Sequence, residues 1–152
     1  MQTVLVTGAT GFTGGHLARF LVQKGFRVRA LVRPGKDASA LTSVGIEIAT
    51  GDLTDRESLD AAMSGIDVVY HIAALYREEG VSKQRFWDVN VTGTKNLIEA
   101  AEKAGVRRFV HCSTVGVQGE IQNPPATEEA PYRPGDHYQQ SKMEGEQEEI
   151  VG

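Results

Sequence analysis

The sequence predicts an α/β fold built on a doubly wound parallel sheet. Short apolar segments rich in β-branched residues alternate with segments of helical periodicity along the whole chain. Turns of glycine or other small residues follow several of the apolar segments. The usual topology of such sheets gives the strand order 3-2-1-4-5, with a crevice above the carboxyl ends of strands 1 and 4. We expect residues 1–152 to form one domain.

The first predicted strand, Thr3–Val6, leads into a glycine-rich turn, Thr7-Gly8-Ala9-Thr10-Gly11-Phe12-Thr13-Gly14-Gly15, and then into a helix over 16–23. Gly8 permits a sharp turn, Gly11 lets backbone N–H groups approach an anion, and Gly14 lets the helix and the strand pack closely. The positive end of the helix dipole points into this turn. The turn therefore predicts a phosphate site, against the alternative of a strand–helix turn that binds nothing.

Periodicity and helix-ending signals mark the later elements. Thr54 and Glu57 form a capping box for one helix, and Gly105 ends the longest one. The inner face of the longest helix is expected to hold Phe86, Val89 or Asn90, Gly93, Leu97, Ala100, Ala101 and Ala104. The predicted strands are 27–32, 46–50, 66–70 and 108–112; the predicted helices are 38–42, one after Thr54, 82–104 and one from about 136, after a loop over 113–134.

The composition is that of a globular protein, with 40% hydrophobic and 24% charged residues and a net charge of −4. This charge gives no reason to expect nucleic acid or a membrane surface as a partner. No apolar segment reaches transmembrane length, and charge and glycine interrupt the first apolar run, so we expect neither an anchor nor a signal peptide. The single cysteine, Cys112, excludes an internal disulfide and favours a reducing, cytoplasmic location. We predict no metal site.

Two basic residues follow the second predicted strand. Arg33 stands where a dinucleotide-binding fold meets the adenosine ribose, and Lys36 adds a second positive charge. A cation there favours a 2′-phosphate, whereas an acid would favour a free 2′-hydroxyl. The sequence therefore favours NADP over NAD as the cofactor, against the alternative of a solvated basic turn.

Residues after the third and fourth strands complete the expected adenosine and nicotinamide sites. The Asp52 carboxylate could accept a hydrogen bond from the adenine amino group, and Leu53 could pack on the ring; the alternative for Asp52 is an ordinary loop acid. His71, Ala73 and Ala74 leave the fourth strand in small residues, which permits close approach of a cofactor. His71 by itself is more often a core histidine than a ligand.

Tyr138 and Lys142 are four residues apart on a predicted helix and so share one face. A phenol titrates near pH 10, and a neighbouring ammonium would lower its pKa towards neutrality, which makes it a usable acid or base. Without the rest of the chain, the default reading is a surface tyrosine beside a surface lysine. Ser113 and Thr114 follow the fifth strand, where a hydroxyl could hydrogen-bond a substrate carbonyl.

Six motifs occur in order along the chain: Thr7–Gly14, Gly51-Asp52-Leu53, His71-Ile72-Ala73-Ala74, Asn90-Val91-Thr92-Gly93-Thr94, Ser113–Gly119 and Tyr138-Gln139-Gln140-Ser141-Lys142. Together they closely resemble the extended short-chain dehydrogenase/reductases, the epimerase/dehydratase group. The resemblance implies a Rossmann fold that binds NAD(P), with Tyr138 as catalytic acid/base and Lys142 as the residue that lowers its pKa and binds the nicotinamide ribose. It places Thr114 as the substrate-orienting hydroxyl, with Ser113 second, and Asn90 in a proton relay.

Relatives of this group continue beyond the point that corresponds to residue 152, with a carboxyl-terminal substrate domain that we expect to be absent here. We expect an NADP-preferring oxidoreductase of a carbonyl or alcohol substrate. The alternatives are a nucleotide-sugar epimerase or dehydratase with tightly bound NAD, and a dinucleotide-binding fragment without catalysis. Gln118 stands where many relatives carry tyrosine. The resemblance also implies a homodimer through the helices at 82–104 and 136–152, and we expect little or no turnover from these 152 residues alone.

Overall fold

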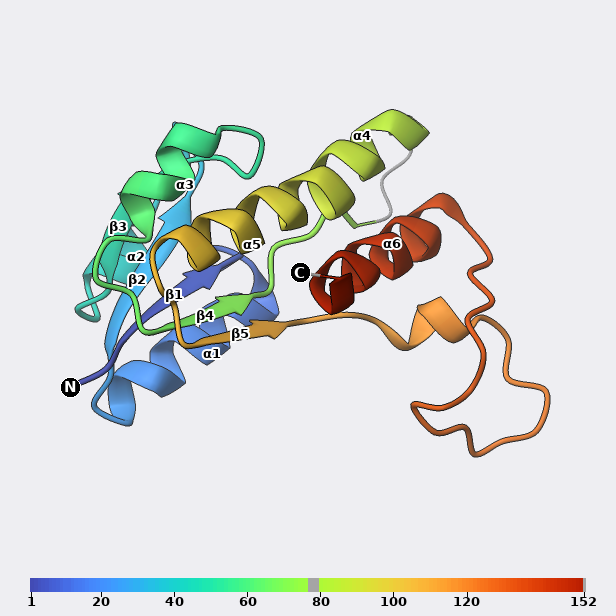
Figure 1. Cartoon of the computed structure of the whole chain (residues 1–152). Coiled ribbons are helices and arrows are strands. Elements are labelled where there is room, and N and C mark those ends of the chain that lie inside the picture. Colours follow the sequence, from blue (N-terminus) through green and yellow to red (C-terminus); the bar gives the residue numbers. More distant parts are fainter. Residues whose placement is uncertain (77–79, 152) are drawn as a thin grey trace.

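Five parallel strands form the centre of the molecule in the order β3-β2-β1-β4-β5. The computed structural model describes residues 1–76 and 80–151. Figure 1 shows the sheet with α1 on one face and α3 and α5 on the other. The predicted fold class and strand order are confirmed. The strands are β1 (Thr3–Thr7), β2 (Arg27–Val32), β3 (Glu47–Thr50), β4 (Val68–His71) and β5 (Arg108–His111).

Helices connect the strands as right-handed crossovers require. The predicted long helix is one continuous rod that contains a π-helical turn, η1 (Asp88–Thr92), between α4 (Lys83–Trp87) and α5 (Gly93–Lys103). A short 3₁₀ turn, η2 (Val115–Gln118), follows β5. The other helices are α1 (Phe12–Gln23), α2 (Ser39–Thr42), α3 (Arg56–Ala62) and α6 (His137–Val151). None of the helices in the described ranges combines the length and the apolar character needed to cross a bilayer.

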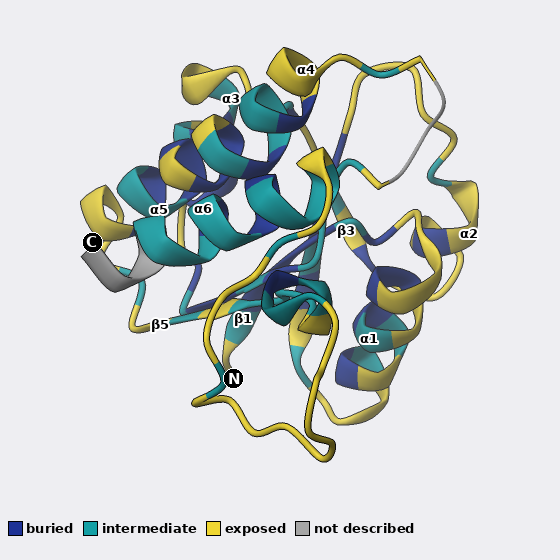
Figure 2. Cartoon of the chain, turned by 90° about the vertical axis from the view of Figure 1, so that its right-hand side faces the viewer, coloured by how far each residue is buried: buried dark blue, intermediate teal, exposed yellow. Residues whose placement is uncertain are grey.

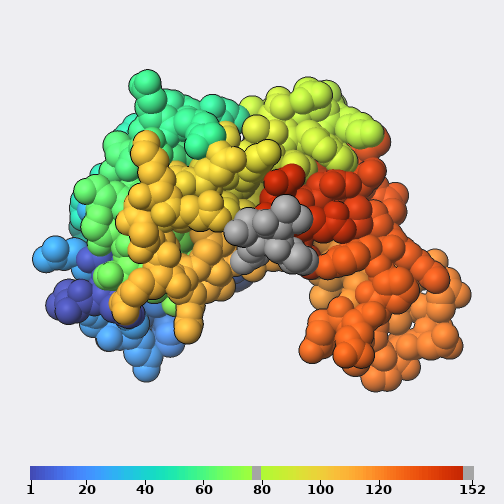
Figure 3. All heavy atoms as spheres, in the orientation of Figure 1, coloured from blue at the N-terminus to red at the C-terminus, as the bar shows by residue number. Residues whose placement is uncertain are grey.

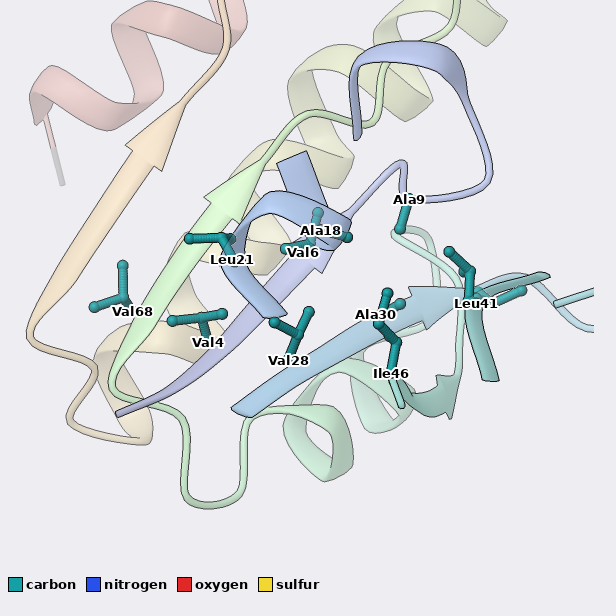
Figure 4. Close-up of a cluster of buried hydrophobic side chains, with 11 residues drawn as sticks. Val4, Val6, Ala9, Ala18, Leu21, Val28, Ala30, Leu41, Ile46 and Val68 are labelled. Carbon is teal, nitrogen blue, oxygen red and sulfur yellow. The ribbon is translucent and has the colours of Figure 1, made fainter. Parts of the chain in front are cut away.

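Alternate residues along each strand supply two separate cores, one on each face of the sheet. Val4, Val6 and Val28 pack with Ala18 and Leu21 of α1, as Figure 4 shows. Their neighbours in sequence point to the other face, where α3 and α5 cover them. That second core contains Leu5, Leu31, Val69, Leu59, Met63, Leu97, Ala100 and Ala101.

Three local predictions are wrong. Asp55, not Thr54, caps α3: its side chain accepts a hydrogen bond from the backbone N–H of Ser58, while the Thr54 hydroxyl donates to Asp52. Ala104 is exposed because α5 ends at Lys103 and Ala104 is its carboxyl cap. The first helix starts at Phe12 rather than at residue 16, so the glycine-rich turn forms its first turn.

The last helix lies apart from the sheet and packs on the helices that cover it. The amino-terminal half of α6 runs beside α4 and η1. The segment between β5 and α6 protrudes from the body of the molecule, as Figure 3 shows, and Figure 2 shows that much of it is exposed. The segment directly after β5 lies next to α6, the helix that carries Tyr138.

Candidate active site

A cavity of about 910 Å³ opens at the carboxyl ends of the strands. It brings together most of the residues that the sequence singled out. The predicted cofactor residues that line it are Gly8, Thr10, Gly11, Phe12, Thr13, Gly14, Arg33, Lys36, Asp52, Leu53, Ala73, Ala74, Tyr138 and Lys142. Ser113 lines it as well, whereas His71, Asn90 and Thr114 do not. The expected convergence on one edge of the sheet is thus present.

The glycine-rich turn is too tight for side chains at two of its glycines. Gly8 has a φ of 73°, and a Cβ there would lie 2.8 Å from the backbone nitrogen of Ala73. A Cβ on Gly14 would overlap the carbonyl oxygen of Gly8, so helix α1 can approach β1 only with glycine at this position. No side chain caps the amino end of α1 at Gly11. This cradle fits a dinucleotide diphosphate, which would lie against the amino end of the helix.

His71 does not face the cavity; it links the turn after β1 to the long helix. Its Nδ1 lies 2.8 Å from Thr7 Oγ1 and its Nε2 lies 2.9 Å from Thr94 Oγ1. Thr7 Oγ1 already accepts hydrogen bonds from two backbone N–H groups after β4, so its own proton goes to Nδ1. The Nε2–H of His71 then donates to Thr94, whose hydroxyl donates to the carbonyl of Asn90. Burial lowers the pKa of His71 well below its ordinary value, and the ring is neutral.

Asn90, in the π turn, acts as a clamp rather than as a cavity residue. Its Oδ1 accepts from the backbone N–H of Leu75, and its Nδ2 donates to the Leu75 carbonyl and to Ser141 Oγ. Ser141 in turn donates to the carbonyl of Tyr138. A Cβ on Gly145 would overlap the Asn90 carbonyl, so α6 approaches the π turn closely. The Asn90 amide therefore joins the segment after β4, through Leu75, to α6, through Ser141.

Tyr138 and Lys142 both face the cavity from α6. Lys142 is buried and its Nζ donates a 2.8 Å hydrogen bond to the carbonyl of Cys112. Burial lowers the pKa of Lys142. The Tyr138 ring makes an edge-on contact with the ring of Tyr76, with centroids 5.0 Å apart. A phenol and an ammonium one helical turn apart, in a shielded cavity, can pass a proton to or from a bound alcohol.

The two hydroxyls after β5 have different surroundings. Ser113 Oγ donates to Glu146 Oε2 at 2.5 Å. Thr114 Oγ1 accepts from the backbone N–H of Gly116 at 3.2 Å and caps η2. Both residues thus lie next to α6, but the cavity reaches only Ser113.

The far end of the cavity carries the charged residues expected around adenosine. Asp52 Oδ1 accepts from both the N–H and the hydroxyl of Thr54. These bonds, with smaller contributions from the charges of Arg33 and Arg85, lower the pKa of Asp52. The Asp52 carboxylate is therefore ionised at neutral pH. The Leu53 carbonyl accepts from Asn96 Nδ2, which holds this segment against α5.

A profile of the NAD dependent epimerase/dehydratase family matches residues 4–150. The chain belongs to this family. The expected resemblance is confirmed, and with it a Rossmann-type dinucleotide-binding fold.

Curated members of the family extend well past this chain. The chain is 40% identical over 153 residues to sterol demethylase protein B of Methylococcus capsulatus. The match covers 99% of this chain and 47% of that protein. It is 37% identical over 150 residues to a putative dihydroflavonol 4-reductase of Synechocystis. This match covers 96% of the chain and 43% of that protein. The chain thus spans about half the length of the curated relatives that it matches.

Solved structures of family members superpose closely on the chain. A UDP-glucose 4-epimerase from Stenotrophomonas maltophila, with bound NAD and a formylated UDP-arabinopyranose, matches 99% of the chain and 48% of its own length, with a TM-score of 0.91 and 29% identity. A short-chain dehydrogenase/reductase superfamily protein from Agrobacterium tumefaciens with bound NAD matches 99% of the chain and 44% of its own length, with a TM-score of 0.87 and 33% identity.

The family motifs do not include every residue that the cavity uses. Arg85 and Tyr76 both line it, and sequence analysis passed over them. Arg85 had a signal, because it precedes Val89, another lining residue, by one helical turn. Glu146 had one as well, since it continues the four-residue spacing of Tyr138 and Lys142. Tyr76 lies in a polar loop with no periodicity, and nothing in the sequence marks it.

Proposed function

We propose that this chain forms the dinucleotide-binding and acid–base part of an oxidoreductase that interconverts an alcohol and a carbonyl group. One observation carries the proposal: Tyr138 and Lys142 line the same cavity as the glycine-rich turn. The phosphate cradle and the proton-transfer pair come from opposite ends of the sequence, yet they line one cavity. Such an arrangement suits a ligand that reaches from one to the other, as a nicotinamide dinucleotide does.

The protein's own residues would hold the substrate and move its proton. When bound, the nicotinamide ring supplies or accepts hydride at the carbon of the substrate. In the oxidation direction, Tyr138 takes the proton from the substrate hydroxyl, and the hydride leaves the carbon that carries this hydroxyl. The Lys142 ammonium stabilises the phenolate form of Tyr138. The Thr114 hydroxyl would hydrogen-bond the substrate oxygen and hold it near the phenol. In the reduction direction each transfer is reversed.

We propose NADP as the preferred cofactor. Arg33 and Lys36 line the cavity after β2, and Arg85 lines it from α4. Three cations at the adenosine end suit a 2′-phosphate, which carries negative charge that a free 2′-hydroxyl lacks. The NAD-bound structures of relatives with epimerase chemistry support the alternative, a nucleotide-sugar epimerase or dehydratase with tightly held NAD.

The experiment that tests the function is Tyr138→Phe in the full-length protein, with Tyr70→Phe as the matched control. We expect Tyr138→Phe to lower turnover of a responsive ketone or nucleotide sugar by about 100-fold or more, with dinucleotide affinity retained. Net oxidation of NADPH supports the reductase, whereas isomer exchange without net cofactor change supports the epimerase. Full activity in Tyr138→Phe would refute the proposal.

Two further proposals concern the chain by itself. Because it spans about half of its relatives, we propose that it binds a dinucleotide weakly and turns over little or no substrate; robust activity from these 152 residues would contradict this. We also propose a homodimer through the helices at 83–103 and 137–151. Sedimentation that shows a monomer at high concentration would contradict the dimer.

A further inference from the structure

The Glu146 carboxylate lies one helical turn beyond Lys142 and joins two segments that are far apart in the loop after β5. Its Oε2 accepts the Ser113 hydroxyl at 2.5 Å, and its Oε1 accepts the Tyr132 hydroxyl at 2.7 Å. Ser113 is the second residue after β5, and Tyr132 lies near the end of the loop. Each carboxylate oxygen thus holds a different end of the segment that runs from β5 to α6.

Counting protons separates the two hydroxyls after β5. A serine hydroxyl has one proton to donate, and that of Ser113 goes to Glu146. The Thr114 hydroxyl accepts from Gly116 N–H, and its own proton has no acceptor among the described residues. Of the two, only Thr114 can donate to a substrate oxygen without first breaking a charge-assisted hydrogen bond.

We infer that Glu146 is a positioning residue of the site. It engages the proton of the Ser113 hydroxyl, which lines the cavity, and so leaves the hydroxyl of the next residue, Thr114, as the one that can donate to a substrate that extends past the present cavity lining. It also anchors the loop after β5 to α6 through Tyr132. This inference rests on the proposed function, because a substrate oxygen is what Thr114 would meet.

Backbone contacts also bring the two ends of the loop after β5 together. The N–H of Arg133 donates to the Val117 carbonyl at 2.8 Å. Gly119 has a φ of 63°, and a Cβ there would overlap the Arg133 carbonyl. Tyr132 and its neighbour therefore return to η2 at close range, and the Tyr132–Glu146 bond ties this closed base to α6. The exposed part of the loop can then vary without moving Ser113 and Thr114.

Charge gives Glu146 an effect beyond its two hydrogen bonds. The titratable groups that face it are Tyr132 from the loop, His111 from β5 and Lys142 from α6. Its hydrogen bond and charge raise the pKa of Tyr132. At Lys142 the Glu146 charge opposes the lowering of the pKa by burial, and so favours the ammonium form. A neutral side chain of the same shape removes this charge and leaves the packing in place.

The test uses the full-length protein with NADP bound and three variants: Glu146→Gln, Ser113→Ala and the two combined. Glu144→Gln is the matched control, since it removes the same charge from the same helix two residues away. Nuclear magnetic resonance of labelled tyrosine and lysine side chains follows the titrations of Tyr132 and Lys142. We expect Glu146→Gln to lower both midpoints, because the carboxylate charge that favours the protonated forms is gone, and Glu144→Gln to move them less.

Kinetics then test whether Glu146 acts through Ser113. If it does, the effects of Glu146→Gln and Ser113→Ala on kcat are not additive, and the double variant resembles one of the single variants. Additive effects, or midpoints that Glu146→Gln moves no more than Glu144→Gln does, overturn the inference.

The inference can still be tested if Glu146→Gln does not fold, or if the full-length protein shows no turnover. If Glu146→Gln does not fold, the wild-type protein still tests the contact, because Tyr132 must titrate above the ordinary tyrosine value of about 10. A Tyr132 that titrates at or below that value overturns the inference. If the full-length protein shows no alcohol or carbonyl turnover, the proposed function fails, while the two titrations still decide whether Glu146 makes these contacts.

Discussion

The Nζ atom of Lys142 donates a 2.8 Å hydrogen bond to the carbonyl oxygen of Cys112, which ties the last helix of the chain to the residue that follows β5. The bond fixes the ammonium one helical turn from Tyr138. It also satisfies a charge that is otherwise buried among the strand ends. The geometry suits an ammonium that acts on the neighbouring phenol by its charge.

Replacing Lys142 by methionine should separate charge from packing. We expect Lys142→Met to lower turnover at pH 7 by about 100-fold or more, because the phenolate form of Tyr138 then loses the stabilising charge of the Lys142 ammonium. Activity should recover partly as the pH rises, since the phenolate forms without help. Rates measured from pH 6 to 10 check this, with Lys103→Met, which removes a surface ion pair with Asp60, as control. A loss that is equal at every pH would contradict the charge effect.

The two hydroxyls after β5 should differ in their effect on catalysis. Thr114→Val keeps the shape but removes the hydroxyl, and we expect it to lower kcat by about 100-fold, whereas Thr114→Ser should restore most of the rate. Ser113→Ala should lower kcat by only a few-fold, through the freed Glu146 carboxylate. Steady-state kinetics at saturating cofactor provide the measurement. The reverse order of the two effects would assign the donor role to Ser113.

Cofactor preference should depend on Arg33. We expect Arg33→Ser to weaken NADP binding by about 10- to 100-fold and to leave NAD binding within about threefold, because a guanidinium–phosphate bond contributes roughly 1.5–3 kcal/mol. Calorimetric titration with both dinucleotides measures the ratio. Arg27→Ser is the control, since Arg27 lies at the opposite end of the same strand and is exposed. Equal losses for both dinucleotides, or tighter binding of NAD by the wild type, would contradict NADP preference.

Much of the fold follows from sequence alone because its signals are local. β-Branched strands, the glycine-rich turn and Gly105 each define their element by chain geometry. The strand order then follows from the usual topology of doubly wound sheets. What could not be predicted depends on which of several competing partners a polar group bonds. Thr54 fails as a cap because Asp52 takes its hydroxyl, and the choice of Asp55 depends on that competition.

The same distinction holds in the site. Arg33 and Asp52 can be placed at the cavity from sequence because strand ends meet at one edge of a parallel sheet, whereas Tyr138 and Lys142 are singled out by their spacing on a predicted helix. The role of Asn90 as a clamp depends on Ser141, more than fifty residues later, and on a π turn that periodicity does not reveal. The state of Ser113 depends equally on Glu146. Motif spacing identifies which residues approach the cavity, whereas their hydrogen bonds decide what each can donate.

Two histidines at the end of adjacent strands should make the stability of the protein depend on pH. His71 and His111 lie side by side on β4 and β5, with ring centroids 5.3 Å apart. Both ring nitrogens of His111 are buried without a hydrogen-bond partner among the described residues. Burial lowers the pKa of His111 to about 4, and burial lowers that of His71 as well. The folded state therefore binds fewer protons than the unfolded state between about pH 4 and 6.5.

The contribution of the two neutral histidines to the free energy of unfolding should accordingly be complete above about pH 6.5 and fall as the pH drops towards 4. His111 alone accounts for about 3 kcal/mol of this fall, because its imidazole binds a proton in the unfolded chain but not in the folded chain over this pH range. Urea unfolding at pH 7 and pH 5 measures the difference. His111→Gln should reduce it, whereas His137→Gln, at an exposed position at the start of α6, should leave it unchanged. A wild-type protein equally stable at both pH values would show that the two rings are hydrated or protonated in the folded state.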